Sequence, residues 1–207
     1  SQIPAATFGL AQPIVYNTGN DQVDDLALAG DLAGNLWRFD LSSPDPAEWA
    51  VDLMFRSYGH GGAANPGDQP VSAAPILMKD LTNQLPMVVF GTGKFLGTAD
   101  RTAAIKEQSF YGIRDYGTCN ADNPVACANY PIKVGQLVTQ TMEQNADGVR
   151  RITSAFPIPV ARRGWRIRMN IPNVPGERSS GIPFPFYSSN QVLLRSDRKS
   201  TRLELQS

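Results

Sequence analysis

The residues best suited to chemistry lie in one short polar stretch, residues 17–25, which reads Asn-Thr-Gly-Asn-Asp-Gln-Val-Asp-Asp. Oxygen-bearing side chains recur there at alternate positions, with Asn17, Asp21 and Asp25 in one register. Loops that bind hard cations such as Ca²⁺ space their oxygen ligands in this way. A turn rich in Asn and Asp can also use these side chains to cap its own backbone amides without any metal. The residues alone leave both interpretations open.

Two short apolar segments after this stretch must position it. Residues 26–32 read Leu-Ala-Leu-Ala-Gly-Asp-Leu, and residues 33–41 continue with Ala-Gly-Asn-Leu-Trp-Arg-Phe-Asp-Leu. The first is a short strand, Gly30 and Asp31 begin a tight turn, and the second alternates large apolar residues as a strand does. Turns rich in Gly and Asx between short β segments are typical of an antiparallel meander. The polar stretch is therefore expected to be a loop at the end of a β-sheet.

Composition places the chain among mostly β proteins. The 207 residues include 18 Gly and 16 Pro, and no long amphipathic helix pattern is present. Residues 1–149 carry 8 Lys and Arg against 16 Asp and Glu, whereas residues 150–207 carry 11 against 3. The basic residues alternate with apolar ones, as in Arg166-Ile167-Arg168-Met169, which is typical of the solvated face of a strand. We therefore expect no nucleic-acid partner.

The two cysteines, Cys119 and Cys127, flank a polar loop that contains Pro124. Two thiols cannot form a four-thiolate metal site. A local disulfide is the preferred interpretation and would fit an oxidising compartment, with two unpaired thiols as the alternative. The sequence has no run of about 18 apolar residues, so we expect no membrane span.

A repeat of strand patterns predicts the fold class. Pro13 and Pro75 each open a similar unit about 62 residues apart, and each unit supplies about four short strands. The expected strands lie near residues 12–16, 25–30, 35–41 and 50–56, and near residues 73–79, 86–91, 108–115 and 134–141. Four strands per repeat indicate propeller blades. We predict an all-β chain that forms a partial β-propeller of about two to three four-stranded antiparallel blades, as a fragment of a longer protein.

Later segments extend this pattern and then depart from it. Residues 135–144 and 148–156 are expected to form a hairpin, and residues 163–170 another strand. We assign residues 1–178 to the partial propeller. The sequence beyond Ser179 no longer fits the strand pattern of a blade. Residues 179–207 are therefore interpreted as an irregular tail that is non-native or frame-shifted.

The glycine-rich segment 57–68 does not predict enzymatic chemistry. It lacks the Lys-Ser/Thr ending of a phosphate-binding loop and precedes a strand, so nucleotide binding is discarded. His60, the only histidine, would have to serve any Ser-His-Asp triad. A solvated loop histidine is the preferred interpretation, and we expect the protein not to be an enzyme.

The ordered set of motifs resembles a known family, the type IV pilus tip-associated biogenesis proteins and adhesins of the PilC/PilY type, in their C-terminal β-propeller. The resemblance covers roughly residues 9–178 and keeps the order of the family's motifs. It rests on the Pro-led strand, the acidic loop and the segments Ala29–Leu32, Gly34–Asp40, Gln69–Pro70, Ala73–Pro75, Phe90–Leu96, Gln108–Ser109, Tyr111–Gly112, Arg163–Trp165 and Gly176–Arg178.

The resemblance implies a calcium loop like the first nine positions of an EF-hand. Its metal ligands would fall on Asn17, Gly19, Asp21, Val23 (through the backbone carbonyl) and Asp25. The family prefers Asp, Asn and Asp at the first three positions, whereas this chain has Asn at the first and Gly at the second. Gln22 replaces the turn glycine. Because few carboxylates remain, we expect weak Ca²⁺ binding, with a dissociation constant on the order of 10⁻⁴ to 10⁻³ M.

The implied function is that of a non-enzymatic, secreted module at the pilus tip or outer membrane of a bacterium. It would support pilus biogenesis, control of retraction and surface adhesion, with pilus subunits or minor pilins and a host surface receptor as partners. The alternative from a different class is a blade of a quinoprotein dehydrogenase that binds pyrroloquinoline quinone, because Ala29-Gly30-Asp31 and Gly34–Trp37 also resemble its blade motif. A calcium-stabilised adhesion propeller outside pili is a third reading.

Overall fold

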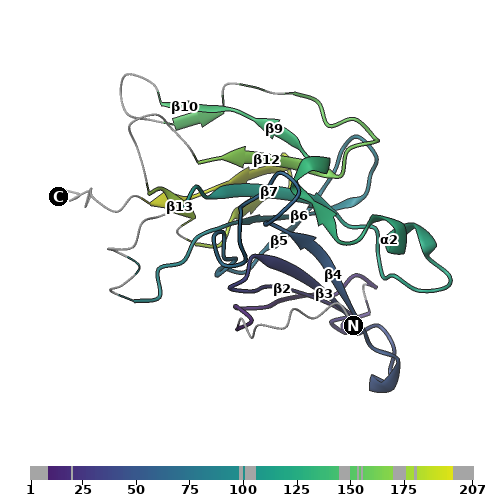
Figure 1. Cartoon of the computed structure of the whole chain (residues 1–207). Coiled ribbons are helices and arrows are strands. Elements are labelled where there is room, and N and C mark those ends of the chain that lie inside the picture. The colour runs from purple at the N-terminus through teal and green to yellow at the C-terminus, as the bar shows by residue number, and fades with distance from the viewer. Residues whose placement is uncertain are drawn as a thin grey trace.

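The computed structural model describes residues 9–19, 21–97, 100, 106–144, 150–152, 154, 156–169, 176–179 and 181–197. Within these residues the chain is almost entirely β, with two five-stranded sheets that carry the core. In Figure 1 the sheet that contains β7, β9 and β12 lies above the sheet that contains β2, β3 and β4. Neither sheet closes on itself. The predicted all-β class is confirmed.

The first sheet follows the predicted meander closely. Its strand order is β1-β2-β3-β4-β8, and the first four strands pair antiparallel. The register changes between Leu36 and Trp37, where β3 meets β4 through a bulge. The strands span Ile14–Tyr16 (β1), Leu26–Gly30 (β2), Asn35–Asp40 (β3), Ala50–Arg56 (β4) and Ile132–Lys133 (β8). The short strand β8 comes from much later in the chain and runs parallel to β4.

The second sheet corrects one expectation. Its order is β5-β6-β7-β12-β9, formed by Ile76–Lys79, Pro86–Gly91, Ser109–Arg114, Gly164–Arg168 and Val138–Gln140 respectively. Residues 134–141 were expected to supply the fourth strand beside β7, but that place is taken by β12. Instead, β9 lies outside β12 and runs parallel to it. Within residues 134–141, a 3₁₀ turn, η2 (Val134–Gln136), precedes β9.

Two contacts explain why β12 pairs with β7. Gly112 on β7 faces Trp165 on β12, and a Cβ at Gly112 would lie 2.3 Å from an indole carbon of Trp165. Only glycine leaves room for that ring. The fully buried Arg114 donates through Nε to Asp80 at 2.5 Å and through Nη1 to the carbonyl of Pro159 at 2.9 Å. These bonds fix the segment that leads into β12.

The remaining elements are short. They are η1 (Pro46–Glu48), α2 (Pro124–Asn129), the hairpin of β10 (Met142–Gln144) and β11 (Arg150–Ile152), the pair β13 (Arg178–Ser179) and β16 (Ser196–Asp197), and the hairpin of β14 (Phe184–Phe186) and β15 (Gln191–Leu193). The predicted hairpin after residue 135 forms as β10 and β11, and its turn residues 145–149 lie outside the described residues. The assignment of 179–207 to a non-native tail stays a prediction.

The main core lies between the two sheets. It joins apolar side chains of the first sheet, such as Leu28, Leu36 and Phe55, to Val88, Phe90, Tyr111 and others of the second. The rings of Phe55, Phe90 and Tyr111 form a triangle with centroid separations of 4.8 to 5.6 Å. Each such aromatic pair adds about 1 kcal/mol beyond its buried area. The two sheets therefore pack through one shared apolar layer, as neighbouring blades do.

Candidate functional site

The polar stretch forms the loop that joins β1 to β2. Both ends of this loop are fixed by the sheet, because the Asp25 amide donates to the Tyr16 carbonyl at 3.0 Å. The Leu41 amide in turn donates to the Asp25 carbonyl at 2.8 Å, which ties the loop to the end of β3. All five predicted ligand positions lie in this loop, at one edge of the first sheet.

Asp25 organises the start of the loop. Its Oδ1 accepts hydrogen bonds from the Thr18 amide and the Thr18 hydroxyl, both at 2.8 Å, and its Oδ2 accepts one from the Gly19 amide at 2.8 Å. Burial acts to raise the pKa of this carboxyl, but the hydrogen bonds from Thr18 and Gly19 outweigh it, so the pKa lies below its ordinary value. Asp25 is thus held as a carboxylate with its oxygens turned toward the loop.

Asp21 and Gln22 form the tip. Asp21 Oδ1 accepts a hydrogen bond from the Val23 amide at 3.0 Å, an Asx turn. Gln22 adopts a φ of 70°, in the left-handed region that glycine occupies most easily. This is the position at which an EF-hand loop has its turn glycine. The backbone therefore keeps the shape of a glycine turn although the residue is glutamine.

Gly19 lies where the two carboxylates converge. A Cβ added at Gly19 would lie 3.2 Å from Asp25 Oδ2 and 3.6 Å from Asp21 Oδ1. Asn17 and Val23 are exposed at the two flanks, and Val23 leaves 58% of its surface accessible. The structure thus brings together Asp21 and Asp25, whereas Gly19 contributes no side chain. Among the residues that the structure describes, no group of three or more His, Cys, Asp or Glu side chains is arranged to hold a metal.

The donor set fits a weak site for a hard cation. Two carboxylates converge on a space that glycine leaves empty, and the same loop contains the backbone carbonyl of Val23 and the side-chain amide of Asn17. Calcium takes six to eight oxygen ligands, so water would have to complete the shell. The five predicted ligands stay a prediction. Asn20, which sits between Gly19 and Asp21, lies outside the described residues.

The next turn of the meander is built differently. Asp31, between β2 and β3, is only 4% exposed. Its Oδ1 accepts from the amides of Gly34 and Asn35, both at 2.9 Å, and its Oδ2 accepts from Asn35 Nδ2 at 2.7 Å and Trp37 Nε1 at 2.9 Å. Donors of the protein occupy both oxygens of this carboxylate, so Asp31 serves to hold the turn.

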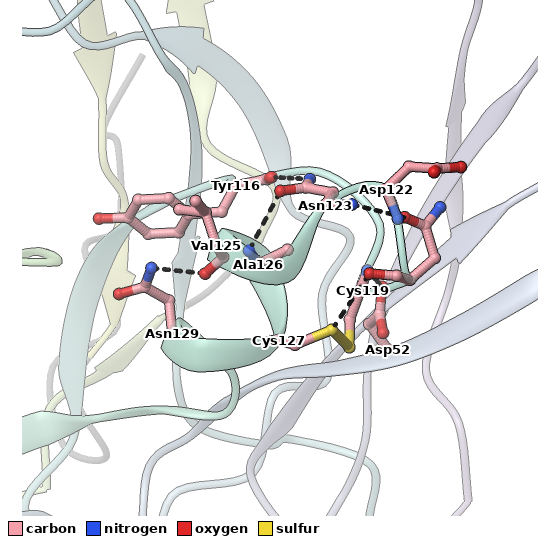
Figure 2. Close-up of a disulfide and its surroundings, with 10 residues drawn as sticks. Asp52, Tyr116, Cys119, Asp122, Asn123, Val125, Ala126, Cys127 and Asn129 are labelled. Carbon is pink, nitrogen blue, oxygen red and sulfur yellow. Dashed lines mark hydrogen bonds between the residues drawn. A yellow bond between two sulfur atoms is a disulfide. The ribbon is translucent and has the colours of Figure 1, made fainter.

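The predicted disulfide is present. Cys119 and Cys127 are bonded, with a Cα–Cα distance of 4.6 Å, and the bridge closes the loop that contains the start of α2 (Figure 2). Asn123 caps α2 by accepting from the Ala126 amide at 3.3 Å, and it donates to the Tyr116 carbonyl at 2.7 Å. The Cys119 amide donates to Asp52 Oδ2 on β4 at 3.0 Å, as Figure 2 shows. The bridge is thereby tied to the first sheet.

A charged network beside the disulfide joins the two sheets, and sequence reasoning missed it. Arg38 on β3 donates through Nε to Asp115, which follows β7, at 3.3 Å, and through Nη1 to Thr118 at 2.6 Å. Thr118 in turn donates to Asp40. Because Arg38 and Asp115 are 77 residues apart, no local spacing pattern reports their contact.

The pKa values of two carboxyl groups near this network, Asp40 and Asp52, are shifted in opposite directions. Burial acts to raise the pKa of Asp40, but hydrogen bonds from Ser42 and Thr118 outweigh it and lower the pKa to about 2. At Asp52 burial dominates and raises the pKa, despite the hydrogen bond from Cys119. The contacts of Arg38 and Thr118 therefore join the two sheets at this point.

His60 lies in an exposed turn. Its backbone has a φ of 45°, and its carbonyl accepts a hydrogen bond from the Gly135 amide at 2.9 Å. The contact of His60 with the rest of the protein is thus made by its main chain. Its place is that of a turn residue between the glycines at 59 and 61.

Comparisons with known proteins relate this architecture to one family. The model of the PilY1 β-propeller domain matches residues 4–154. The type IV pilus biogenesis factor PilY1 of Pseudomonas aeruginosa strain PAO1 is 34% identical over 160 residues, which cover 67% of this chain and 13% of that protein. A PilY1 homologue of Xylella fastidiosa is 34% identical over 121 residues, which cover 57% of this chain and 9% of that protein.

A solved structure agrees with these sequence matches. The crystal structure of the P. aeruginosa PilY1 C-terminal domain superimposes with a TM-score of 0.73 at 26% identity, over 96% of this chain and 46% of that one. The two open sheets are consistent with part of a propeller, as predicted. The chain spans less than a fifth of the length of the curated relatives it matches. It belongs to the PilY1 β-propeller family and corresponds to part of the C-terminal domain.

Proposed function

We propose that this chain is a non-enzymatic module of a type IV pilus biogenesis factor that acts at the bacterial surface. The observation that carries the proposal is the match of the fold to the PilY1 C-terminal domain over 96% of the chain. The sequence relatives, which are named as pilus biogenesis factors, support the same assignment. The quinoprotein alternative is not favoured, because the family model and the superimposed structure are both of PilY1.

The loop between β1 and β2 would bind Ca²⁺ weakly. Asp21 and Asp25 would supply carboxylate oxygens, Val23 its carbonyl and Asn17 its amide, with water in place of a side chain at Gly19. The convergence of the two carboxylates beside Gly19 and the left-handed turn at Gln22 support this assignment. Calcium, when bound, supplies positive charge that holds the carboxylates together and orders the loop at the edge of the first sheet.

Such a module would work on the outside of the cell, at the pilus tip or the outer membrane. Its partners would be pilus subunits or minor pilins, and in adhesion a receptor on the host surface. Among the residues described, no helix is long and apolar enough to cross a membrane. Ordering of the loop by calcium would fix one edge of the first sheet, and this change at the surface is the means by which we propose that calcium influences pilus retraction.

Gene replacement in the source bacterium tests both levels of the proposal. Deletion of the gene is expected to abolish or strongly reduce surface pili, and the wild-type copy to restore them. A copy with Asp21→Ala and Asp25→Ala is expected to restore pili but to lose the calcium dependence of retraction, measured as twitching motility with and without a chelator. Asp24→Ala, an exposed neighbour out of register, is the matched control and should behave as wild type.

The role in pilus biogenesis and the calcium-binding role of the loop can be refuted separately. Normal surface pili in the deletion strain would refute a role in pilus biogenesis. Normal calcium dependence of retraction in the double variant would refute the role of the loop and leave the biogenesis assignment standing.

A further inference from the structure

A cavity of about 410 Å³ lies apart from the loop at Asp25, where the glycine-rich turn after β4 approaches the second sheet. Residues 61–64 of that turn line the cavity, together with the basic residues Arg166 and Arg168 of β12. The cavity is partly open to solvent. Its lining is therefore polar and cationic, unlike the apolar layer between the sheets.

Arg166 is held in position across this cavity. It lies on β12 between Tyr111 of β7 and Thr139 of β9. Its Nε donates to Thr139 Oγ1 at 2.9 Å, and its Nη1 donates to the Gly61 carbonyl at 3.1 Å. Both acceptors are neutral, and no carboxylate in the part of the chain that the structure describes forms an ion pair with Arg166. The guanidinium is thus oriented by neutral acceptors, and none of the described carboxylates forms an ion pair with it.

The other charges of the cavity are partly paired. Arg168 makes a two-pronged contact with Glu107, from Nε to Oε1 and from Nη2 to Oε2, both at 2.6 Å. Lys106 is exposed at the rim and has no ion pair with the described residues. Asp68 also lines the cavity, and its carboxylate accepts a hydrogen bond from the Asn65 amide at 3.1 Å. Among the described residues that line the cavity, three cations therefore accompany two carboxylates.

Gln69 stiffens the floor of the cavity. Its Nε2 donates to the Glu107 carbonyl at 2.7 Å, and its Oε1 accepts from the buried Tyr111 hydroxyl at 2.6 Å. Because Gln69 is almost fully buried, its hydrogen bond holds the main chain of Glu107 in place. The side chain of Glu107 in turn pairs with Arg168. The arrangement is preformed, so a ligand would not have to order it.

The balance of charge selects the ligand. One net positive charge, a planar guanidinium and an ammonium group match a carboxylate, which a guanidinium can bind through two parallel hydrogen bonds. A phosphate dianion carries both negative charges on one group and would bring the second close to Asp68 and Glu107. The second carboxylate of a dicarboxylic acid can instead lie in solvent. We propose that this cavity binds a carboxylate group between Arg166 and Lys106. The group would come either from a small free carboxylic acid or from an acidic side chain of a peptide segment.

Calorimetric titration of the full-length protein at low salt tests the proposal with four probes. They are succinate, a tetraglutamate peptide with blocked ends, the matching tetraglutamine peptide, and inorganic phosphate. We expect succinate or tetraglutamate to bind with a dissociation constant of about 1 mM or lower. Binding should weaken as ionic strength rises, because the contact is electrostatic and open to solvent. Binding of tetraglutamate alone would identify a peptide as the source, whereas succinate binding would identify a small acid.

Two variants place the binding in this cavity. Arg166→Gln with Lys106→Gln should weaken it by at least tenfold, which corresponds to about 1.4 kcal/mol. The matched control is Arg162→Gln with Lys79→Gln, which removes two exposed cations outside the cavity, one of which also donates to a carbonyl. Because loss of Arg166 could disturb β12, Lys106→Glu serves as a second variant that changes only an exposed rim side chain.

Three results would overturn the proposal. The first is the absence of heat with both succinate and tetraglutamate up to about 10 mM, well above the expected dissociation constant. The second is equal binding by the wild type, by Lys106→Glu and by the double variant Arg166→Gln with Lys106→Gln, and the third is binding of phosphate or tetraglutamine as tight as that of the carboxylates.

Discussion

Two acidic turns of the same sheet illustrate opposite uses of a carboxylate. Asp31 lies between β2 and β3, is buried, and receives four hydrogen bonds from Gly34, Asn35 and Trp37. Asp25 lies at the other end of β2 and receives three, all from Thr18 and Gly19. Asp21, beside it, is exposed and accepts one through Oδ1.

The difference lies in whether the protein supplies all the partners of the carboxylate. A carboxylate has about four acceptor sites, and at Asp31 four protein donors occupy them in a buried position. At Asp21 and Asp25 acceptor sites remain open to solvent, and both groups point at the space beside Gly19. The first arrangement can only hold a turn, whereas the second also suits a cation. The predictions that follow test this contrast.

Asp31→Ala is expected to have the largest effect on stability. It leaves the Trp37 indole and the Asn35 amide without their acceptor in a buried turn, at a cost of about 3 kcal/mol. The Gly34 amide keeps the backbone carbonyl of residue 31 as its acceptor. Urea denaturation followed by tryptophan fluorescence measures the change, with the exposed Asp24→Ala as the control. A loss below about 1 kcal/mol would contradict the structural role of Asp31.

Gly19→Asn is expected to strengthen calcium binding by roughly tenfold, because it adds an oxygen ligand at the second position of the loop. The new Cβ would lie 3.2 Å from Asp25 Oδ2, so the carboxylate has to shift by a few tenths of an ångström. Gly9→Asn, where a Cβ would meet nothing within 4 Å, is the control. Calorimetry with CaCl₂ measures both variants. Unchanged or weaker binding by Gly19→Asn would argue against a ligand position there.

Gln22→Gly is expected to have a smaller effect of about 1 kcal/mol or less. It removes the cost of a left-handed glutamine but adds freedom to the unfolded chain. Gln84→Gly is a matched control, since Gln84 has a φ of 65° outside the loop. Both variants should change thermal stability similarly, and only Gln22→Gly should change calcium affinity. If both variants changed calcium affinity equally, the turn at Gln22 would not be part of the proposed calcium site.

The smallest expected effect is a shift in the pH at which calcium binding is lost on acidification, produced by Thr18→Val. The lowered pKa of Asp25 means that its contribution to folding is present above the ordinary value of 3.8 and is lost as the pH falls through the folded pKa. Protonation of Asp25 should therefore limit calcium binding only when the pH falls below 3.8. Thr18→Val removes one stabilising hydrogen bond to Asp25 Oδ1 and should move the acid midpoint of binding upward. A midpoint that moves downward would contradict the role of Thr18.

The first four strands of the first sheet could be predicted from the sequence because they are neighbours in the chain, whereas β8, which comes from much later, was not among the expected strands. The expected strands near 25–30, 35–41 and 50–56 agree with β2, β3 and β4 within two residues. Their alternating apolar residues and Gly-Asp turn are local signals. The disulfide between Cys119 and Cys127 was predictable for the same reason, since the two cysteines are only eight positions apart in the sequence.

The second sheet and the charged junction depend on distant residues. The place of β12 beside β7 is set by the fit of Trp165 over Gly112, more than 50 residues away. The ion pair of Arg38 with Asp115 joins two sheets that the sequence pattern treats as separate repeats. At the loop, the sequence indicated the ligand register, but it could not show that Gln22 would adopt the glycine conformation.

The most direct test is a calorimetric titration of the full-length protein with Ca²⁺, wild type beside the double variant Asp21→Ala and Asp25→Ala, with Asp24→Ala as control. We predict one weak site, with a dissociation constant on the order of 10⁻⁴ to 10⁻³ M, that disappears in the double variant and remains in the control. The same number of sites in all three proteins, or no heat in the wild type up to several millimolar, would contradict calcium binding by this loop.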